Sequence, residues 1–219
     1  PLFKPYQWNF YDWGMLSNGY VSNYGVQAVS AWTISTGTGV KVAVVDTGVA
    51  YEDYGPYKQA PDLANTYFDV DGAYDFVNGD THANDDEGHG THVAGTIAQS
   101  TNNATGVAGI AYEATILPVK VLDANGSGTY DHIASGVRWA VDHGARVINL
   151  SLGGSFDSQT LHDAITYARN SGVVVVCAAG NSGNPRIIYP AKYPECISVG
   201  ATRFDGAKTK YSSYGPQLK

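Results

Sequence analysis

Hydrophobic residues gather in five short runs, and longer polar stretches separate them. Several of these runs are continuous Val, Ile and Leu, without alternation of apolar and polar positions. A strand buried on both faces of a parallel sheet has such a sequence, because neither of its faces meets water. The runs therefore predict five buried strands, at 41–46, 115–122, 146–152, 173–178 and 196–201.

Three segments between these runs are typical of helices. Apolar residues recur at helical spacing over 133–141 and 161–168, and Gly144 and Gly172 predict where these two helices end. The segment 89–99 is rich in Gly, Ala and Thr and predicts a third, tightly packed helix. Alternating strands and helices indicate an α/β fold, a three-layer, open, mostly parallel sheet with helices on both faces.

Length and composition indicate one domain. The chain has 219 residues, 43% of them hydrophobic and 15% charged. This length is enough for one domain with a sizeable core. We expect an arm with a short helix at 1–36, where aromatic and polar residues have no clean period, and the main domain at 37–219. The long polar segment 50–87 predicts a functional loop.

The charge of the chain excludes some partners. A net charge of −7 argues against binding to nucleic acid or to an anionic membrane surface. No apolar run approaches the roughly 18 residues that span a bilayer. An acidic balance suits cation binding, although solubility alone also accounts for it. Cys177 and Cys196 fit either redox environment and could bridge or remain two buried thiols.

Four groups of residues, most of them glycine or polar, lie at the carboxyl ends of predicted strands. They lie at Asp46, 125–130, 151–154 and 178–183. Ligands of open α/β sheets bind beyond the carboxyl ends of the strands, so these clusters predict one shared site.

Asp46 ends the first apolar run. A carboxylate that is partly buried needs a partner, which is either the backbone of Thr47 and Gly48 in a local cap or a functional group elsewhere. Asp-Thr-Gly also occurs in aspartic proteases. Those enzymes are rich in β-structure and need two such aspartates, whereas this chain has one and a βαβ pattern.

His89 and His92 lie three positions apart, on one face of the predicted helix at 89–99. Zinc binding is an alternative, but a zinc site needs a third ligand and usually a Glu between the two histidines. The glycines around His89 instead predict close backbone packing around a catalytic imidazole. We interpret His89 as a general base and His92 as a packed structural imidazole.

Four motifs, met in this order, resemble those of the subtilisin-like serine proteases, the subtilases, in their thermitase and bacterial subtilisin branch. They are Val-Val-Asp-Thr-Gly-Val at 44–49, Gly-His-Gly-Thr-His-Val-Ala-Gly-Thr at 88–96, Ser-Leu-Gly-Gly at 151–154 and Ala-Ala-Gly-Asn at 178–181. The similarity runs from about residue 38 to the C-terminus. It implies a secreted, calcium-stabilised serine endopeptidase that acts on polypeptides.

The resemblance implies roles for three residues. Asp46 would orient and stabilise the ring of His89, which would be the general base, and Asn181 would donate its side-chain amide to the oxyanion. Without the resemblance, Asn181 between Gly180 and Ser182 is typical of a turn.

The resemblance also implies a clamp for an extended peptide, which would lie between residues 126–128 and 151–153 as an added strand. The alternative for 126–128 is an ordinary glycine turn before a helix. Small walls imply a roomy pocket for large apolar or aromatic side chains at the cleaved position. The predicted substrate-binding residues are Gly126, Ser127, Gly128, Tyr130, Ser151, Leu152, Gly153, Ala178, Ala179 and Gly180.

Two loops are similar to calcium-binding loops of the family. Oxygen-bearing residues alternate along 75–84, which suits a hard cation, with a solvated acidic loop as the alternative. The loop 100–107 resembles the family's tighter site, whose acidic N-terminal ligand the residues around Lys4 do not supply. The predicted Ca²⁺ ligands are Asp75, Asn78, Asp80, His82 through its carbonyl, and Asn84 in the first loop, and Asp62, Ser100, Asn103, Thr105 and Val107 in the second.

One motif of the family, the one that carries its nucleophilic serine, is missing from the sequence. The nucleophilic serine of the family lies in a Gly-Thr-Ser-Met-Ala motif at the start of a long helix, and the 219 residues contain no such motif. We therefore expect a fold that is incomplete at its C-terminus, a C-terminal fragment of the same protein that carries the serine, and a propeptide during maturation. The alternatives are a catalytically incomplete fragment and a non-catalytic module that binds peptide and calcium.

Overall fold

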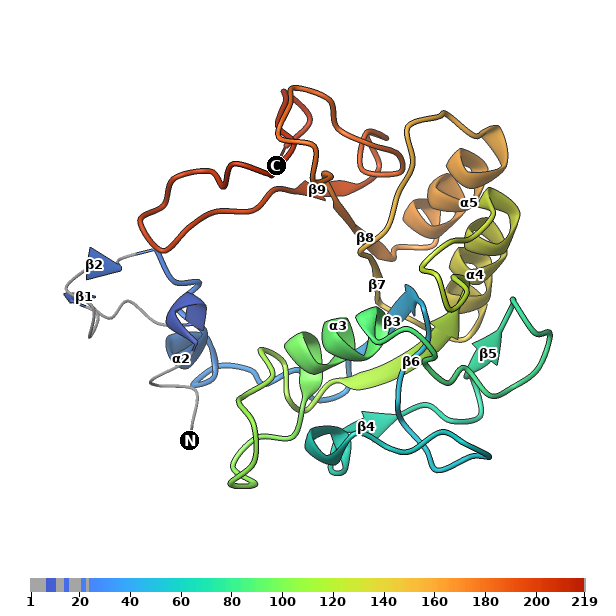
Figure 1. Ribbon diagram of the computed structural model, residues 1–219, viewed down its shortest axis with the longest axis horizontal. Coiled ribbons are helices and arrows are strands. Elements are labelled where there is room, and N and C mark those ends of the chain that lie inside the picture. Colours follow the sequence, from blue (N-terminus) through green and yellow to red (C-terminus); the bar gives the residue numbers. More distant parts are fainter. Residues whose placement is uncertain (1–6, 11–13, 16–20, 23, 219) are drawn as a thin grey trace.

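A parallel sheet forms the centre of the molecule. The computed structural model describes residues 7–10, 14–15, 21–22 and 24–218 (Figure 1). Six strands are ordered β4-β6-β3-β7-β8-β9, β5 also pairs with β6, and every pair in this sheet is parallel. The strands are β3 (Lys41–Asp46), β4 (Tyr67–Phe68), β5 (Tyr74–Asp75), β6 (Thr115–Lys120), β7 (Val147–Leu150), β8 (Val174–Ala178) and β9 (Ile197–Val199).

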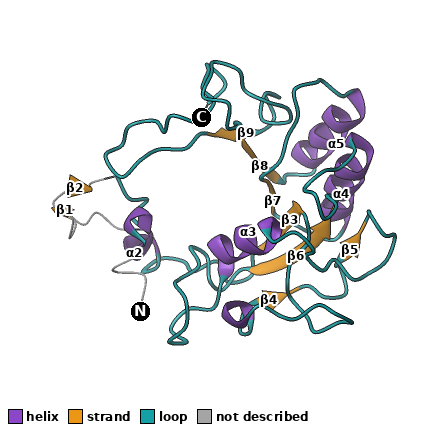
Figure 2. Ribbon diagram, in the orientation of Figure 1, coloured by secondary structure: helices purple, strands orange, loops and turns teal. Residues whose placement is uncertain are grey.

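Helices cover both faces of the sheet, which confirms the predicted open α/β fold. Helix α3 (His89–Ala98) lies on one face, and α4 (Tyr130–Asp142) and α5 (Gln159–Asn170) lie side by side on the other (Figure 2). The hydroxyls of Thr129 and Ser158 cap the amino ends of α4 and α5. Gly144 and Gly172 follow these helices in the left-handed conformation, with φ of 77° and 78°.

The core has a larger and a smaller part, one on each face of the sheet. Apolar residues of α4 and α5 such as Val137 and Ile165 pack with Ile148 of β7 in the larger part. Ala94 and Ala98 of α3 pack with alternate residues of β3 in the smaller part. Because β3 is buried on both faces, it is a continuous apolar run that ends at Asp46.

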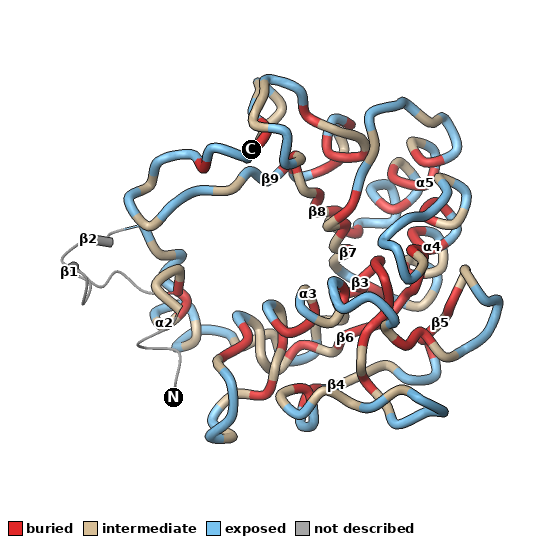
Figure 3. Tube along the Cα trace, in the orientation of Figure 1, coloured by how far each residue is buried: buried red, intermediate tan, exposed pale blue. Residues whose placement is uncertain are grey.

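One half of the sheet is covered on a single face. Residues of β7, β8 and β9 that point toward α4 and α5 are buried, whereas their neighbours on the other face are more accessible (Figure 3). Ile197 and Val199 are 40% and 46% exposed. We call this surface the open face; it consists of Val147, Asn149, Val174, Val176, Ala178, Ile197 and Val199.

The N-terminal region contributes short elements, and residues 1–6, 11–13, 16–20 and 23 of the predicted arm lie outside the described chain. The elements are the 3₁₀ helix η1 (Trp8–Phe10), the antiparallel strands β1 (Gly14–Met15) and β2 (Val21–Ser22), and helix α2 (Ala28–Ala31). A second 3₁₀ helix, η2 (Pro61–Leu63), lies between β3 and β4. Phe10 and Ala28 pack with Ala108. Within the described ranges, no helix has the length and apolarity needed to cross a membrane.

Candidate active site

Asp46 and His89 meet at the carboxyl end of β3. Nδ1 of His89 lies 2.7 Å from Oδ1 of Asp46, which is fully buried, whereas the His89 side chain is 47% exposed. Burial raises the pKa of Asp46, and the hydrogen bonds from His89 and Thr47 oppose that effect. With its Nδ1 proton donated to Asp46, the imidazole presents the lone pair of Nε2, as a general base must.

Thr47 and Asp85 fix the position of this pair. The backbone N–H of Thr47 donates to Oδ1 of Asp46 at 2.7 Å, and its hydroxyl donates to Asp85 and accepts from the N–H of Gly90. Burial alone would raise the pKa of Asp85, but hydrogen bonds from Thr91, Gly88 and Glu87 outweigh burial and lower it. Asp85 therefore connects the end of β3 to the start of α3 as a carboxylate.

Lys120 ties the ends of β3 and β6 together. Its Nζ donates to the carbonyls of Thr47 and Leu122 at 2.7 and 2.8 Å and pairs with Asp86 at 2.6 Å. The side chain is 1% exposed, so the ammonium is buried, but its bonds are all made to oxygens that attract it. This contact holds the residue after Asp46 in place.

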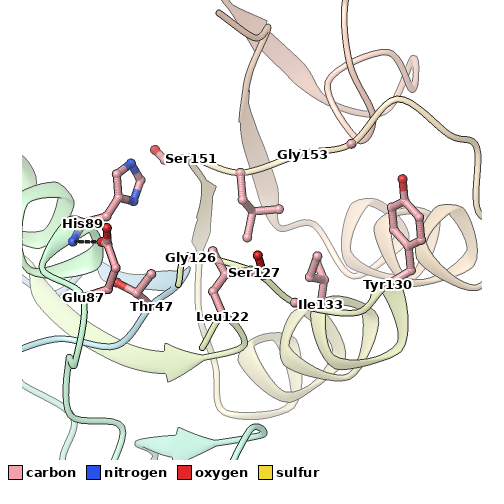
Figure 4. A pocket seen from close by; sticks show the side chains of 13 residues that line it. Thr47, Glu87, His89, Leu122, Gly126, Ser127, Tyr130, Ile133, Ser151 and Gly153 are labelled. Atoms are coloured by element: carbon pink, nitrogen blue, oxygen red, sulfur yellow. Dashed lines mark hydrogen bonds between the residues drawn. The ribbon is translucent and has the colours of Figure 1, made fainter. Parts of the chain in front are cut away.

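A cavity of about 510 Å³ extends from His89 along the ends of the strands. Figure 4 shows Glu87, His89 and Ser151 at one end and Tyr130 at the other. Seven of the predicted substrate-binding residues line it: Gly126, Ser127, Gly128, Tyr130, Ser151, Leu152 and Gly153. In the described chain, no backbone group is hydrogen-bonded to the main chain of Gly128, Leu152 or Gly153, which leaves these edges free to pair with an extended peptide.

The remaining predicted residues near the sheet lie outside this cavity lining. Ala178 ends β8, and the residues from Ala179 to Asn181 continue from it. Gly180 has a φ of 109°, and its carbonyl accepts from the N–H of Ser213. Asn181 is exposed, and its side chain makes no hydrogen bond to another described residue.

Five residues of the cavity lining were not among the predicted site residues. Thr47, Glu87, Leu122, Ile133 and Gly154 complete the cavity lining. Glu87 had a visible signal, the acidic run that ends two residues before His89, and Thr47 and Gly154 lie within the motifs at 44–49 and 151–154. Leu122 and Ile133 gave no such signal, because they reach the cavity only through the order of the strands in the sheet. The expected packed imidazole at His92 is wrong, because that residue is exposed on α3.

Cys177 and Cys196 are both buried and free. A hydrogen bond between the two thiols and their burial raise the pKa of Cys177 well above its ordinary value. The pair therefore packs as two thiols beneath the segment that leads to Asn181.

The loop at 100–107 presents three carbonyl oxygens to which no described residue donates. None of the described N–H or O–H groups donates to the carbonyls of Ser100, Thr105 and Val107. Positive φ angles at Asn102, Ala104 and Gly106, of 63°, 61° and 53°, curl the loop around a cavity of about 450 Å³. Asp62 faces the loop and accepts from the side-chain amide of Asn103 at 2.7 Å.

Gln7 also lies beside this loop, which sequence reasoning missed. Its side-chain amide exchanges two hydrogen bonds with the backbone of Ala108, at 2.8 and 2.9 Å. This contact ties the N-terminal region to the end of the loop.

The loop at 75–84 is partly satisfied by its own backbone. The carboxylate of Asp75 accepts from Val77 and Asn78, Asp80 accepts from the N–H of His82, and the carbonyl of His82 accepts from Asn84. Oδ1 of Asn84 is buried and accepts no hydrogen bond from the described residues. Within the described chain, no three His, Cys, Asp or Glu side chains cluster as metal ligands.

Comparison with known proteins identifies the family. A sequence model of a protein family, described as "Subtilase family", matches residues 37–219. The chain belongs to the subtilase family. This subtilase chain is 47% identical to thermitase of Thermoactinomyces vulgaris over 190 residues and 46% identical to subtilisin Savinase of Lederbergia lenta over 183 residues. These alignments cover 87% and 84% of the subtilase chain.

The fold is similar as well. The crystal structure of a cold-adapted subtilisin-like serine proteinase matches 96% of this subtilase chain and 70% of its own chain, with a TM-score of 0.75 and 32% identity. The subtilase chain spans 64% of the length of thermitase and 63% of that of subtilisin Savinase. The relatives thus contain segments that have no counterpart among the 219 residues.

Proposed function

We propose that the whole protein is a secreted serine endopeptidase and that these residues supply its aspartate, its histidine and its oxyanion amide. The observation that carries the proposal is the 2.7 Å hydrogen bond from the half-exposed His89 to the fully buried Asp46, at the end of a peptide-sized cavity. A buried carboxylate that orients an accessible imidazole is the arrangement that activates a hydroxyl nucleophile.

The mechanism assigns each group one task. Nε2 of His89 removes the proton from the serine hydroxyl as its oxygen attacks the scissile carbonyl, and later delivers that proton to the leaving amine. Asp46 keeps the other ring proton on Nδ1 and stabilises the imidazolium. The side-chain amide of Asn181 donates to the oxyanion, a contribution that is typically worth about 10² to 10³ in rate.

The serine comes from a C-terminal segment of the same protein, outside the 219 residues. The open face supports this assignment, because a parallel sheet is ordinarily covered on both faces and this half of the sheet ends beside His89. Its apolar members, such as Val176 and Val199, offer a packing surface for a helix. A propeptide is a further partner during maturation.

The substrate is an extended polypeptide that lies between residues 126–128 and 151–153. The unpaired main chain of Gly128, Leu152 and Gly153 supports this pose. The side chain on the acyl side of the cleaved bond enters the pocket formed by Ala178, Ala179 and Gly180. These small walls favour large apolar and aromatic residues.

Calcium stabilises the folded protein without entering the reaction. In the loop at 100–107, the unpaired carbonyls of Ser100, Thr105 and Val107 fit a cation that prefers oxygen, with Asp62 and Asn103 as its side-chain ligands. In the loop at 75–84, the unpaired Oδ1 of Asn84 supports a second site that includes Asp75, Asn78, Asp80 and the carbonyl of His82. Calcium binding in these loops is consistent with secretion, because extracellular modules bind calcium with dissociation constants of about 10⁻⁴ to 10⁻³ M.

The test is a serine-directed phosphonylating reagent applied to the purified protein while it hydrolyses a peptide with an aromatic residue at the cleaved position. We expect complete loss of hydrolysis and one labelled serine, located by peptide mapping outside residues 1–219. Labelling of Ser151, which lies at the His89 end of the cavity, would contradict the assignment. Peptide binding without any hydrolysis would favour the non-catalytic module instead.

A further inference from the structure

Two buried cysteines lie side by side and take no part in the proposed reaction. Cys177 belongs to β8 and Cys196 immediately precedes β9; each is 1% exposed, and the chain has no other cysteine. Both pack in the larger part of the core, on the side of the sheet that α4 and α5 cover. Their thiols are hydrogen-bonded to each other. The two sulfurs are therefore adjacent in a place that excludes water.

A serine hydroxyl joins this pair of thiols. Ser198 is paired in register with Cys177 across β8 and β9. Because strand residues alternate between the two faces, its side chain points to the same side as Cys196, two positions earlier. Ser198 is fully buried, and its Oγ has no hydrogen-bond partner among the described residues. A buried hydroxyl without a partner costs free energy, so an acceptor beside it would stabilise this part of the core.

The number and type of these groups decide which ligand they suit. Structural zinc needs four ligands, and no third His, Cys, Asp or Glu of the described chain clusters with the two thiols. Soft ions such as Cu⁺, Ag⁺ and Hg²⁺ prefer sulfur and accept two thiolates in a nearly linear arrangement. Burial disfavours a thiolate and raises the pKa of Cys177, but a cation between the sulfurs replaces both protons.

We propose that Cys177 and Cys196 form a binding site for one soft, two-coordinate metal ion, with the hydroxyl of Ser198 as a hydrogen-bond donor to the sulfur of Cys177. On binding, each thiol loses its proton to solvent and each sulfur forms one bond to the ion. A divalent ion gives a neutral complex, which suits the apolar core. A monovalent ion leaves one negative charge, which the Ser198 hydroxyl stabilises. The site is independent of the proposed function, because no catalytic group belongs to it.

The edge of the sheet offers a route for the ion. β9 is the last strand in the sheet order, has three residues and pairs with β8 (Figure 1). Short edge elements open locally at a lower free energy than the centre of a core. Loading of the site should therefore be slow and follow the opening of β9, so the experiments use long incubation.

The first experiment is native mass spectrometry of the full protein after incubation with Hg²⁺ and removal of the excess with glutathione. An ion held by two thiols adds the mass of mercury minus two protons, whereas an ion on one thiol displaces one proton and keeps a second ligand from solution. We expect the first result. Alkylation in urea and peptide mapping should then find both Cys177 and Cys196 protected. This readout needs no variant.

Three results of this experiment would overturn the site. They are the absence of a retained ion, a balance of one proton, and a disulfide between the two cysteines before any ion is added. Zn²⁺ serves as the control ion, because two thiols do not satisfy its four positions. Retention of Zn²⁺ that depends on Cys177 would also overturn the assignment to a two-coordinate ion.

Cysteine variants test whether the two thiols act together. Cys177→Ala and Cys196→Ala each leave one thiol, so the glutathione concentration that removes half of the Hg²⁺ should fall by about 10² to 10⁴. Ile148→Val, a buried residue of β7 in the same part of the core, also loses one heavy atom and should keep the wild-type value. The same value in wild type and in both cysteine variants would overturn the site.

The role of Ser198 is tested by comparing two ions of different charge. Ser198→Ala keeps both thiols and removes the hydroxyl. Because Ag⁺ leaves a negative charge on the complex and Hg²⁺ does not, the variant should retain Ag⁺ about tenfold more weakly, with little change for Hg²⁺. An equal change for the two ions would overturn the hydrogen bond from Ser198.

Discussion

At the scale of single residues, the hydrogen bond between Asp46 and His89 decides what the imidazole can do. An asparagine in place of Asp46 presents a neutral amide, so Nε2 of His89 is no longer held as the unprotonated nitrogen. We expect Asp46→Asn to lower kcat of peptide hydrolysis by about 10⁴ while leaving the thermal unfolding temperature similar. Steady-state kinetics would test this, and a decrease of less than tenfold would show that Asp46 has only a structural role.

Asp85 carries a second prediction, which concerns stability and pH. Its pKa in the folded protein lies below that of an ordinary aspartate, because hydrogen bonds from Thr91, Gly88 and Glu87 outweigh its burial. A depressed pKa contributes stability that is present above the unfolded pKa and is lost as the pH falls through the lower, folded value. Urea unfolding at pH 7 should show Asp85→Asn less stable than wild type by about 1–3 kcal/mol.

The difference between the two proteins should shrink as the pH falls below about 4, where the unfolded carboxyl is protonated. A constant difference from pH 7 to pH 3 would mean that the hydrogen bonds of Asp85 do not depend on its charge. Exposed Asp53, whose pKa is also lowered by hydrogen bonds from Gln59 and Lys58, provides a control outside the site.

At the scale of elements, α3 approaches β3 so closely that one position cannot carry a side chain. A Cβ on Gly90 would lie 2.1 Å from the carbonyl oxygen of Gly48, which belongs to the backbone. A Cβ on Gly95 of the same helix would first meet the flexible end of Gln99. We expect Gly90→Ala to destabilise the protein by about 1–3 kcal/mol or more and to reduce activity through the displacement of His89.

Gly95→Ala is the matched control on the same helix. Alanine favours a helix by about 1 kcal/mol over glycine, so this variant should be neutral or slightly stabilising. Chemical denaturation of both variants would test the pair. Equal effects at the two positions would mean that α3 moves freely relative to β3.

The main elements followed from the hydrophobic pattern, and the shorter ones did not. The run at 41–46 coincides with β3, because a strand buried on both faces has no polar positions that could obscure its limits. Helices α4 and α5 end as Gly144 and Gly172 predict. Strands β4 and β5 have two residues each and exist through pairing with β6, so nothing local marks them.

The site was predictable to the extent that its residues lie in motifs. Asp46 and His89 are 43 positions apart, and the family resemblance indicated that they meet. Lys120 gave no such signal, because its role depends on which strands are neighbours. The uncovered half of the sheet was equally hidden, since a strand sequence does not state which of its faces a helix will cover.

At the scale of the whole molecule, we expect calcium to contribute to global stability. A cation bound only to the folded state at 100 times its dissociation constant adds about 2.7 kcal/mol. A chelator should therefore lower the melting temperature, and added calcium should restore it. Differential scanning calorimetry would measure both, and an unchanged melting temperature would remove the calcium proposal.

The contribution of the loop at 100–107 can be isolated. Asp62→Asn removes the carboxylate that faces this loop and should reduce the effect of the chelator. Asp53→Asn, at an exposed residue of the long polar segment that pairs with Lys58, should leave the effect unchanged. If the chelator lowers the melting temperature of Asp62→Asn as much as that of the wild type, the stabilising calcium ion binds at another site.

The burial of Lys120 has a consequence for chemical modification. Acylating reagents need an accessible, unprotonated amine, and this ammonium is 1% exposed and donates to three oxygens. Lys58, with a side chain 73% exposed, should be acetylated early, whereas Lys120 should remain unmodified until the ends of β3 and β6 separate. Mass spectrometry of a time course would show the order, and equal rates at the two lysines would contradict it. Acetylation of Lys120 would thus measure how often the edge of the sheet beside Asp46 opens in the native protein.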